Sequence, residues 1–516
     1  MLREILLGIG GVILGAYVLE FLYSCSDDSR EPKRVRPTIP IPIIGHILGF
    51  WIHGFDYYDV LNKRNKNLEI YTIGILGFKV YVTHAMRLTN IMQKCKTISL
   101  RPFIRTANKI HGQISDDADS IFDGELVEVF SNRTKEAFAP GPHMDEQNLR
   151  MGEESIVEVA DLLSGKSDEF DLFEWSKHVI VSATGASLFG TDHPFKDPEI
   201  AEAMWIWDDF RPAHIFGIDP LRTGYKAREK VVEAMRKYFR NMPSDASKVI
   251  KERQRILLEG GVPEEDTYKI QSTLSNAYFN TIPTLYWTIY EIYSRPALLE
   301  AIRQEIRERA MVKSEHGEFV LDIAILQTQC QLLLSAYQET QRMRHAQVAF
   351  RMMLEDTMVD QYLLKKGHHL HLAAKPVHLD PVLWGQHVNH FDPYRFVPAA
   401  ATANGNGETK TKTSARPKIL PTSFLPWGAA PWLCPARQFA TTEILIIVAL
   451  LALQCDLEPA DGMGWEENPA VERPKIATLS NPVKNARLRI TKRADGLGTW
   501  KVLIGKSKAR ISLASG

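Results

Sequence analysis

Residues 424–440 read FLPWGAAPWLCPARQFA and form the most informative stretch of this chain. Cys434 stands there between a loop of glycine, proline and alanine residues and an apolar segment that is predicted to be a helix. The N-terminal end of a helix stabilises a thiolate through its free N–H groups and the positive end of its dipole. Small residues before the cysteine allow the backbone to lie close to a flat partner. The stretch therefore predicts a thiolate ligand, with a buried core cysteine as the alternative.

Such a thiolate has the properties of a ligand for a haem iron. Two further segments support the same prediction. Glu339 and Arg342 are spaced i, i+3 in a helix predicted over residues 323–344, so they share one face. Arg395 lies in the aromatic, proline-containing loop FDPYRF, residues 391–396. A planar guanidinium there suits a buried network with the helix pair. Taken alone, the pair is also typical of a surface ion pair.

The segment AYFNTIP, residues 277–283, lies in a helical region predicted over residues 271–309. Asn280 and Thr281 are polar residues in an apolar helix, and Pro283 interrupts the backbone ladder. We expect a kink that opens a groove for a ligand. The alternative is a proline that a core helix tolerates.

The N-terminus predicts a membrane anchor. Residues 5–23, ILLGIGGVILGAYVLEFLY, are apolar apart from Glu20. As a helix they rise roughly 28 Å, enough to cross a hydrocarbon core. Lys33, Arg34 and Arg36 follow closely, and positive charge on that side predicts a cytosolic body. A cleaved signal peptide is the alternative.

We therefore divide the chain into a transmembrane anchor (1–24), a basic and proline-rich hinge (25–46) and a catalytic domain (47–516). The low-complexity residues 399–418 are expected to be a solvated loop insertion in that domain. The body has a mainly helical pattern. Residues 72–83 are the clearest strand.

Composition excludes several classes of protein. Of 516 residues, 45% are apolar and 24% are charged, which is ordinary for a globular protein. Lys plus Arg and Asp plus Glu are each 62, so the totals favour no nucleic-acid partner. The five cysteines are scattered and predict a reducing compartment rather than a disulfide framework. His368, His369 and His371 lie in a strand-like stretch and are predicted to be surface histidines.

The order and spacing of these segments resemble the cytochrome P450 family over nearly the whole chain. The resemblance implies the cytochrome P450 fold, mainly α with small β-sheets, and a haem b whose iron is held by Cys434. It implies that Glu339, Arg342 and Arg395 form the salt-bridged core behind the haem. It also places Arg351 where a haem-propionate partner is often found, and Trp427 where the family usually has phenylalanine.

Several positions depart from the family pattern. Ala430 and Ala436 stand where glycine is usual near the cysteine, and Tyr278 where glycine is usual in the long helix. Trp432 stands where a basic residue is usual. A tryptophan cannot form a salt bridge with a propionate, so that role must fall to another residue.

The long-helix motif resembles the branch that contains cholesterol 7-alpha hydroxylase and prostacyclin synthase, and fungal haem-thiolate enzymes of secondary metabolism. Thr281 would then hydrogen-bond the distal oxygen or a water that delivers protons. Asn280 replaces the usual acid. Because an amide does not titrate, Asn280 can only orient water or substrate.

The resemblance implies a monooxygenase that oxidises a bulky apolar metabolite, terpenoid, meroterpenoid or steroid-like, in fungal secondary metabolism. It would lie in the endoplasmic reticulum membrane and take electrons from NADPH through NADPH-cytochrome P450 reductase. One alternative is an isomerase or dehydratase that acts on an oxygenated substrate without a reductase. Another is a haem-free, membrane-tethered binding protein.

Overall fold

The computed structural model describes residues 2–75, 77–215, 217–313, 318–398, 419–473, 479–505 and 510–515. Most of its elements are helices, and the strands form small sheets, which confirms the predicted fold class. The loop insertion predicted at residues 399–418 lies outside the described residues.

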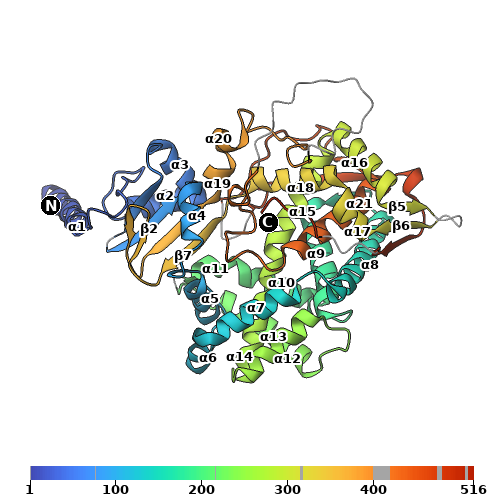
Figure 1. Ribbon diagram of the computed structural model, residues 1–516, viewed down its shortest axis with the longest axis horizontal. Coiled ribbons are helices and arrows are strands. Elements are labelled where there is room, and N and C mark those ends of the chain that lie inside the picture. The colour runs from blue at the N-terminus through green and yellow to red at the C-terminus, as the bar shows by residue number, and fades with distance from the viewer. Residues whose placement is uncertain are drawn as a thin grey trace.

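The largest sheet lies at the end of the molecule that also carries the N-terminal helices (Figure 1). It has five strands in the order β1-β2-β10-β7-β3. β2 pairs antiparallel with β1 and parallel with β10, so chain segments far apart in sequence become neighbours. The strands are β1 (Ile70–Ile75), β2 (Phe78–Thr83), β3 (Ile98–Ser99), β7 (Val348–Met353) and β10 (His369–Ala373).

Three smaller sheets complete the β structure, with the orders β11-β12-β4, β13-β6-β5 and β8-β9. Their strands are β4 (Glu169–Asp171), β5 (Met311–Lys313), β6 (Phe319–Asp322), β8 (Thr357–Val359), β9 (Tyr362–Leu364), β11 (Cys455–Pro459), β12 (Arg487–Lys492) and β13 (Trp500–Leu503).

The core of the helical part surrounds α21 (Arg437–Gln454), which packs against α8, α9, α15, α16, α17 and α18. Every side chain from Thr441 to Gln454 is buried. Because this part of the helix has no face toward solvent, apolar residues surround its axis instead of forming one stripe. The surrounding helices are α8 (Pro142–Ser164), α9 (Leu172–Phe189), α15 (Asn276–Tyr293), α16 (Pro296–Arg309), α17 (Ile323–Gln329) and α18 (Gln331–Arg344).

A second group of helices lies between this core and the sheet end of the molecule and along one side (Figure 1). They are α4 (Met86–Met92), α5 (Arg101–Thr106), the π-helical η2 (Ala107–His111), α6 (Asp116–Ile121), η3 (Phe122–Leu126), α7 (Val127–Ala137), α10 (Pro198–Asp209), α11 (Arg211–Ile215), α12 (Thr223–Arg240), α13 (Lys248–Glu259) and α14 (Glu264–Ser272). Two short helices, α19 (Ala374–His378) and α20 (Pro381–Trp384), follow β10.

The N-terminal helix α1 (Leu2–Cys25) projects from the sheet end of the molecule, followed by α2 (Gly45–His53) and α3 (Tyr57–Arg64) (Figure 1). Among the described residues, α21 is the helix long and apolar enough to cross a membrane, but 89% of that stretch is buried in the protein. Within α1, Leu14–Cys25 forms a shorter apolar helix.

Several predicted elements are divided in the structure. The helical region predicted over 271–309 consists of the end of α14, a 3₁₀ turn, α15 and α16. Pro296 begins α16, as a proline suits the first position of a helix. Pro283, by contrast, lies inside α15, which continues through it. The expected interruption is therefore a missing ladder bond within one helix, not a helix end.

The predicted helix over 323–344 is likewise two helices, α17 and α18, which meet at the buried Cys330. The strand predicted over 72–83 is the hairpin β1–β2, with Ile75 opposite Phe78. The prediction of surface histidines is wrong for His371. Its side chain is buried and its Nδ1 pairs with the hydroxyl of Tyr58.

Candidate functional site

Cys434 lies just before the first turn of α21, in a loop closed by its own backbone. The N–H of Cys434 donates to the carbonyl of Trp427 at 2.9 Å. Burial raises the pKa of the Cys434 thiol, while the backbone N–H of Ala436 and the nearby Arg437 lower it. A thiol in this position gives up its proton readily only beside a compensating positive charge, which a metal ion supplies. The surroundings of Cys434 therefore suit a metal-bound thiolate.

A cavity of about 310 Å³ borders Cys434. Much of its wall is apolar, with Leu100, Ile104, Phe130 and Leu433 among the lining side chains. Leu100 directly precedes α5, Ile104 lies in α5 and Phe130 lies in α7, while Leu433 belongs to the cysteine loop itself. An apolar wall beside a half-buried cysteine fits a flat, apolar macrocycle.

Two cationic side chains also line this cavity, Lys135 of α7 and Arg253 of α13. The Lys135 ammonium lies 5.5 Å from the centroid of the Trp432 ring. Neither residue was identified from the sequence. Each is one charged residue among several in an amphipathic helix, and no local pattern marks it.

Arg351 lies in β7 and its side chain is buried, with 4% of its surface exposed. Its guanidinium donates to the carbonyl of Ala429 at 2.6 Å and to that of Phe350 at 2.7 Å. Within the described residues it meets no carboxylate, and burial lowers its pKa to about 10. A buried cation held only by carbonyl groups suits an anionic group of a ligand. With the Cys434 cavity, this observation shows that the residues present fit a haem with its carboxylate side chains.

Glu339, Arg342 and Arg395 are brought together in one buried network. The Glu339 carboxylate accepts two hydrogen bonds from Arg342 at 2.8 Å, and Arg395 Nε lies 3.0 Å from its Oε2. Arg342 also donates to the carbonyls of His378 and Val388 at 2.7 and 2.8 Å. The network therefore fastens α18 to the end of α19 and to the segment that follows α20.

Thr281 and Asn280 lie in α15 but are absent from the described lining of the Cys434 cavity. The Thr281 hydroxyl donates to the carbonyl of Ala277 at 3.0 Å. Asn280 lines a second cavity of about 440 Å³, together with residues of α9, α10 and α11. The two predicted catalytic residues thus face surroundings other than those of the predicted iron ligand.

The tryptophans of the cysteine loop have different surroundings. The indole N–H of Trp427 is buried and has no hydrogen-bond partner among the described residues. The Trp432 ring instead takes the Lys135 ammonium on its face. Position 432 thus binds a cation where a basic residue was expected.

Tyr278 is absent from the described lining of the Cys434 cavity. Its ring packs edge-to-face on Phe195, with centroids 5.5 Å apart. Burial, and then the charge of Glu443 in α21, raise the pKa of its hydroxyl. The bulky residue at a usual glycine position is therefore accommodated within the helical core.

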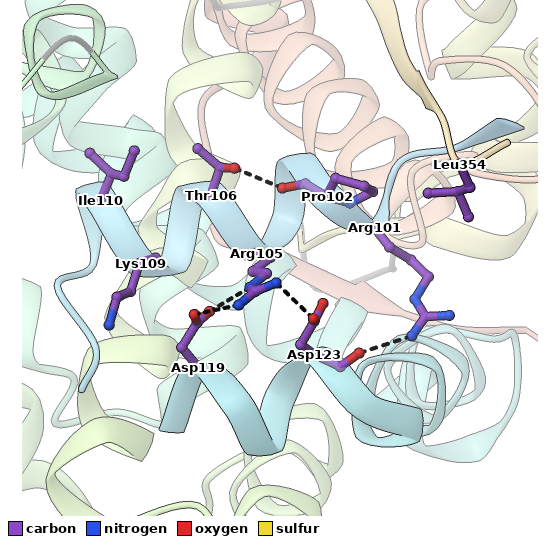
Figure 2. A pocket seen from close by; sticks show the side chains of 9 residues that line it. All are labelled: Arg101, Pro102, Arg105, Thr106, Lys109, Ile110, Asp119, Asp123 and Leu354. Carbon is purple, nitrogen blue, oxygen red and sulfur yellow. Dashed lines mark hydrogen bonds and ion pairs between the residues drawn. The ribbon is translucent and has the colours of Figure 1, made fainter. Parts of the chain in front are cut away.

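A separate cleft of about 550 Å³ lies on the outer side of α5 and η2. Its lining includes Arg101, Arg105 and Lys109. Each directly follows a residue that lines the Cys434 cavity, namely Leu100, Ile104 and Asn108. Figure 2 shows Arg105 between Asp119 and Asp123, at 2.9 and 2.7 Å. Arg101 pairs with Glu128, and Lys109 with Asp116. Carboxylates already balance the cations of this outer cleft.

Comparison with known proteins places the chain in one family. The cytochrome P450 family model matches residues 164–485. The chain is 30% identical over 498 residues to "Cytochrome P450 monooxygenase nodJ" of Hypoxylon pulicicidum, covering 93% of this chain and 94% of that protein. It is 26% identical to a "Cytochrome P450 monooxygenase" of Gibberella zeae, covering 98% and 97%. It is 23% identical to "Cholesterol 7-alpha-monooxygenase" of Cricetulus griseus, covering 84% and 88%.

These relatives confirm the predicted family and the predicted likeness to the cholesterol 7-alpha hydroxylase branch. They also set aside the haem-free binding protein. The chain belongs to the cytochrome P450 family, as a haem-dependent monooxygenase.

Proposed function

We propose that this protein is a membrane-anchored monooxygenase that oxidises a bulky apolar metabolite, terpenoid, meroterpenoid or steroid-like, in fungal secondary metabolism. The observation that carries the proposal is the half-buried Cys434, which lies just before α21 at a cavity with a largely apolar wall. The relatives from Hypoxylon and Gibberella support a fungal enzyme. The name of the cholesterol 7-alpha-monooxygenase relative supports a sterol-sized apolar substrate.

In this proposal Cys434 would hold the haem iron through its thiolate, and Arg351 and Trp427 would help to hold the haem. The haem, when bound, supplies the activation of dioxygen. The Glu339, Arg342 and Arg395 network holds the segments around the cysteine loop in place.

The proposed roles of Thr281 and Asn280 rest on their positions in α15. Pro283 has no N–H, so the carbonyl of Phe279 lacks its usual ladder donor. Asn280 borders a cavity with charged side chains, among them Asp208 and Arg211. We infer that Asn280 would orient water between that cavity and α15. The Thr281 hydroxyl would then exchange its bond to the Ala277 carbonyl for a bond to such a water.

Membrane anchoring is supported by the exposed apolar side chains at the sheet end of the molecule. In α1, Leu14 and Phe21 are each 65% exposed, and Trp51 of α2 is 70% exposed. The Tyr17 hydroxyl donates to the carbonyl of Pro40 at 2.7 Å, which joins α1 to the hinge. The basic residues after α1 favour a cytosolic body on the endoplasmic reticulum. An apolar substrate would concentrate in the same membrane.

The carbon monoxide difference spectrum of the reduced membrane fraction tests the haem-thiolate assignment. Wild type is expected to give a red-shifted, thiolate-type Soret band, and Cys434→Ala to lose it. Cys95→Ala, which changes a cysteine outside the cavity, is the matched control. A thiolate-type band in folded Cys434→Ala would contradict the assignment.

Turnover of terpenoid and steroid candidates then tests the reaction. Product is expected only with NADPH and NADPH-cytochrome P450 reductase, which we propose as the electron donor. Product formed without both would instead favour the isomerase or dehydratase alternative. Nucleic acid has no role in this proposal.

A further inference from the structure

The cysteine loop lacks the cation that the family pattern places two residues before the ligand. Trp432 holds that position, and its ring faces the Lys135 ammonium of α7. An anionic group at this end of the cavity would therefore need a cation from another element. The cavity wall contains one buried candidate, Arg253.

Arg253 lies in α13 and only 7% of its surface is exposed. Its guanidinium lies 4.4 Å from the centroid of the Phe130 ring. Its Nε donates to Oε1 of Gln271 at 2.9 Å. Gln271 in turn donates to Gln254 at 3.3 Å. The guanidinium is therefore held between Gln271 of α14 and the Phe130 ring of α7.

The charge of Arg253 has no counter-charge in the described part of the chain. Its partners there are an aromatic ring and an amide, both neutral, and burial lowers its pKa to about 10. The arginine and lysine residues of the outer cleft differ, because each pairs with a carboxylate. A buried, unpaired guanidinium is unfavourable, and a carboxylate of a ligand would relieve that cost.

The cavity that Arg253 lines is the one beside Cys434. A ligand that fits there has an apolar body against Ile104 and Phe130 and an anionic group toward the cations. We propose that Arg253 pairs with a carboxylate of the haem and takes over the role that Trp432 cannot perform. This inference rests on the proposed haem site, and it adds to Arg351 a second buried arginine on a different element.

The test measures how fast haem leaves the holoenzyme. Full-length wild type and Arg253→Leu are mixed with excess apomyoglobin, and haem transfer is followed by absorbance. A lost charge-assisted hydrogen bond predicts transfer roughly 10- to 100-fold faster in Arg253→Leu. Arg253→Lys keeps the charge and is expected to restore part of the retention. A transfer rate for Arg253→Leu equal to that of wild type would overturn the proposal.

Arg255→Leu is the matched control, because Arg255 lies two residues away on α13 and pairs with Glu252 and Glu259 at the surface. Its transfer rate is expected to match that of wild type. The melting temperature of each apoprotein separates loss of haem from loss of fold.

A haem with esterified carboxylates isolates the charge pairing. Apoprotein of wild type and Arg253→Leu is loaded with protohaem or with its dimethyl ester. The difference between the two proteins is expected to disappear with the ester, because the ester has no carboxylate to pair. An equal difference with both haems would mean that Arg253 acts through packing alone, and would overturn the proposal.

The outcomes also separate this inference from the proposed function. A wild type without a thiolate-type band would contradict the haem site as a whole. A normal wild-type band with unchanged retention in Arg253→Leu would contradict only the role of Arg253.

Discussion

The Nε2 atom of His378 accepts a hydrogen bond from the backbone N–H of Leu425 at 2.9 Å. The carbonyl of His378 accepts a bond from Arg342 at 2.7 Å. His378 therefore connects the buried ion-pair network to the start of the cysteine loop. Burial, with the nearby His345 and Arg342, lowers the pKa of His378 well below its usual value. The ring is neutral, so its Nε2 remains an acceptor.

Replacing His378 with leucine is expected to loosen the cysteine loop. The Leu425 N–H would lose its acceptor in a buried position, which costs about 1–3 kcal/mol of unfolding free energy. Denaturant unfolding measures the loss, and the thiolate-type carbon monoxide band is expected to weaken with it. His390→Leu, at an exposed site, is the control and is expected to change neither. Equal stability of the two variants would show that this hydrogen bond is dispensable.

Replacing Glu339 with glutamine is expected to be among the most destabilising single changes. It leaves Arg342 buried with its charge uncompensated, and removing one partner of a buried pair typically costs about 3–5 kcal/mol. Arg133→Gln breaks the exposed pair with Glu136 and is expected to cost no more than about 1 kcal/mol. Denaturant unfolding of both variants measures the difference. Similar costs for the two would refute the structural role of the network.

Glu443 makes the stability depend on pH. Burial raises the pKa of its carboxyl to about 8, while the bond from Thr184 at 2.6 Å lowers it. The folded pKa lies above the ordinary value of 4.5. The contribution of Glu443 to the unfolding free energy is therefore complete below pH 4.5 and declines as the pH rises toward 8. Glu443→Gln is expected to flatten the stability profile between these values. Unfolding free energies measured at pH 5 to 8 test this, and an unchanged slope would contradict it.

His111 is expected to have the opposite pH dependence. Burial, then Arg211, His214 and Arg228, lower its pKa to about 2. The unfolded chain therefore binds a proton that the folded chain does not, and stability falls as pH drops below 6.5.

His111→Phe keeps an aromatic ring stacked on Trp207, where the histidine now lies with ring centroids 4.6 Å apart. It is expected to reduce the loss of stability between pH 6.5 and 5. It also breaks the contact of His111 Nδ1 with His214 Nδ1 at 3.2 Å, so stability at neutral pH is expected to fall. His387→Phe, at an exposed position, is the control. The same acid slope in wild type and His111→Phe would contradict the assignment.

Thr281→Ala tests the proposed use of the α15 hydroxyl. With a turned-over substrate, product per NADPH is expected to fall and hydrogen peroxide to rise, because a positioned proton donor or water is lost. Thr288→Ala removes another buried hydroxyl of the same helix, which donates to the carbonyl of Thr284 at 2.7 Å. Its coupling is expected to stay at the wild-type value. Full coupling in Thr281→Ala would refute the role.

The sequence alone determined the fold class and the family, because these depend on local patterns. Cys434 before an apolar helix, and Glu339 and Arg342 on one helix face, are short-range features of spacing and composition. They predicted a mainly helical chain of the cytochrome P450 family, as the comparisons confirm.

Only the tertiary structure decided which distant residues those helices and loops contact. It assigned Asn280 and Cys434 to different cavities, buried His371 and joined His378 to Leu425. It also brought Arg253 of α13 to the wall beside Cys434. Helical periodicity indicates that a side chain faces inward, but it carries no information about which distant element lies there. The packing of the whole chain makes that choice, since the cost of a buried charge depends on its neighbours in space.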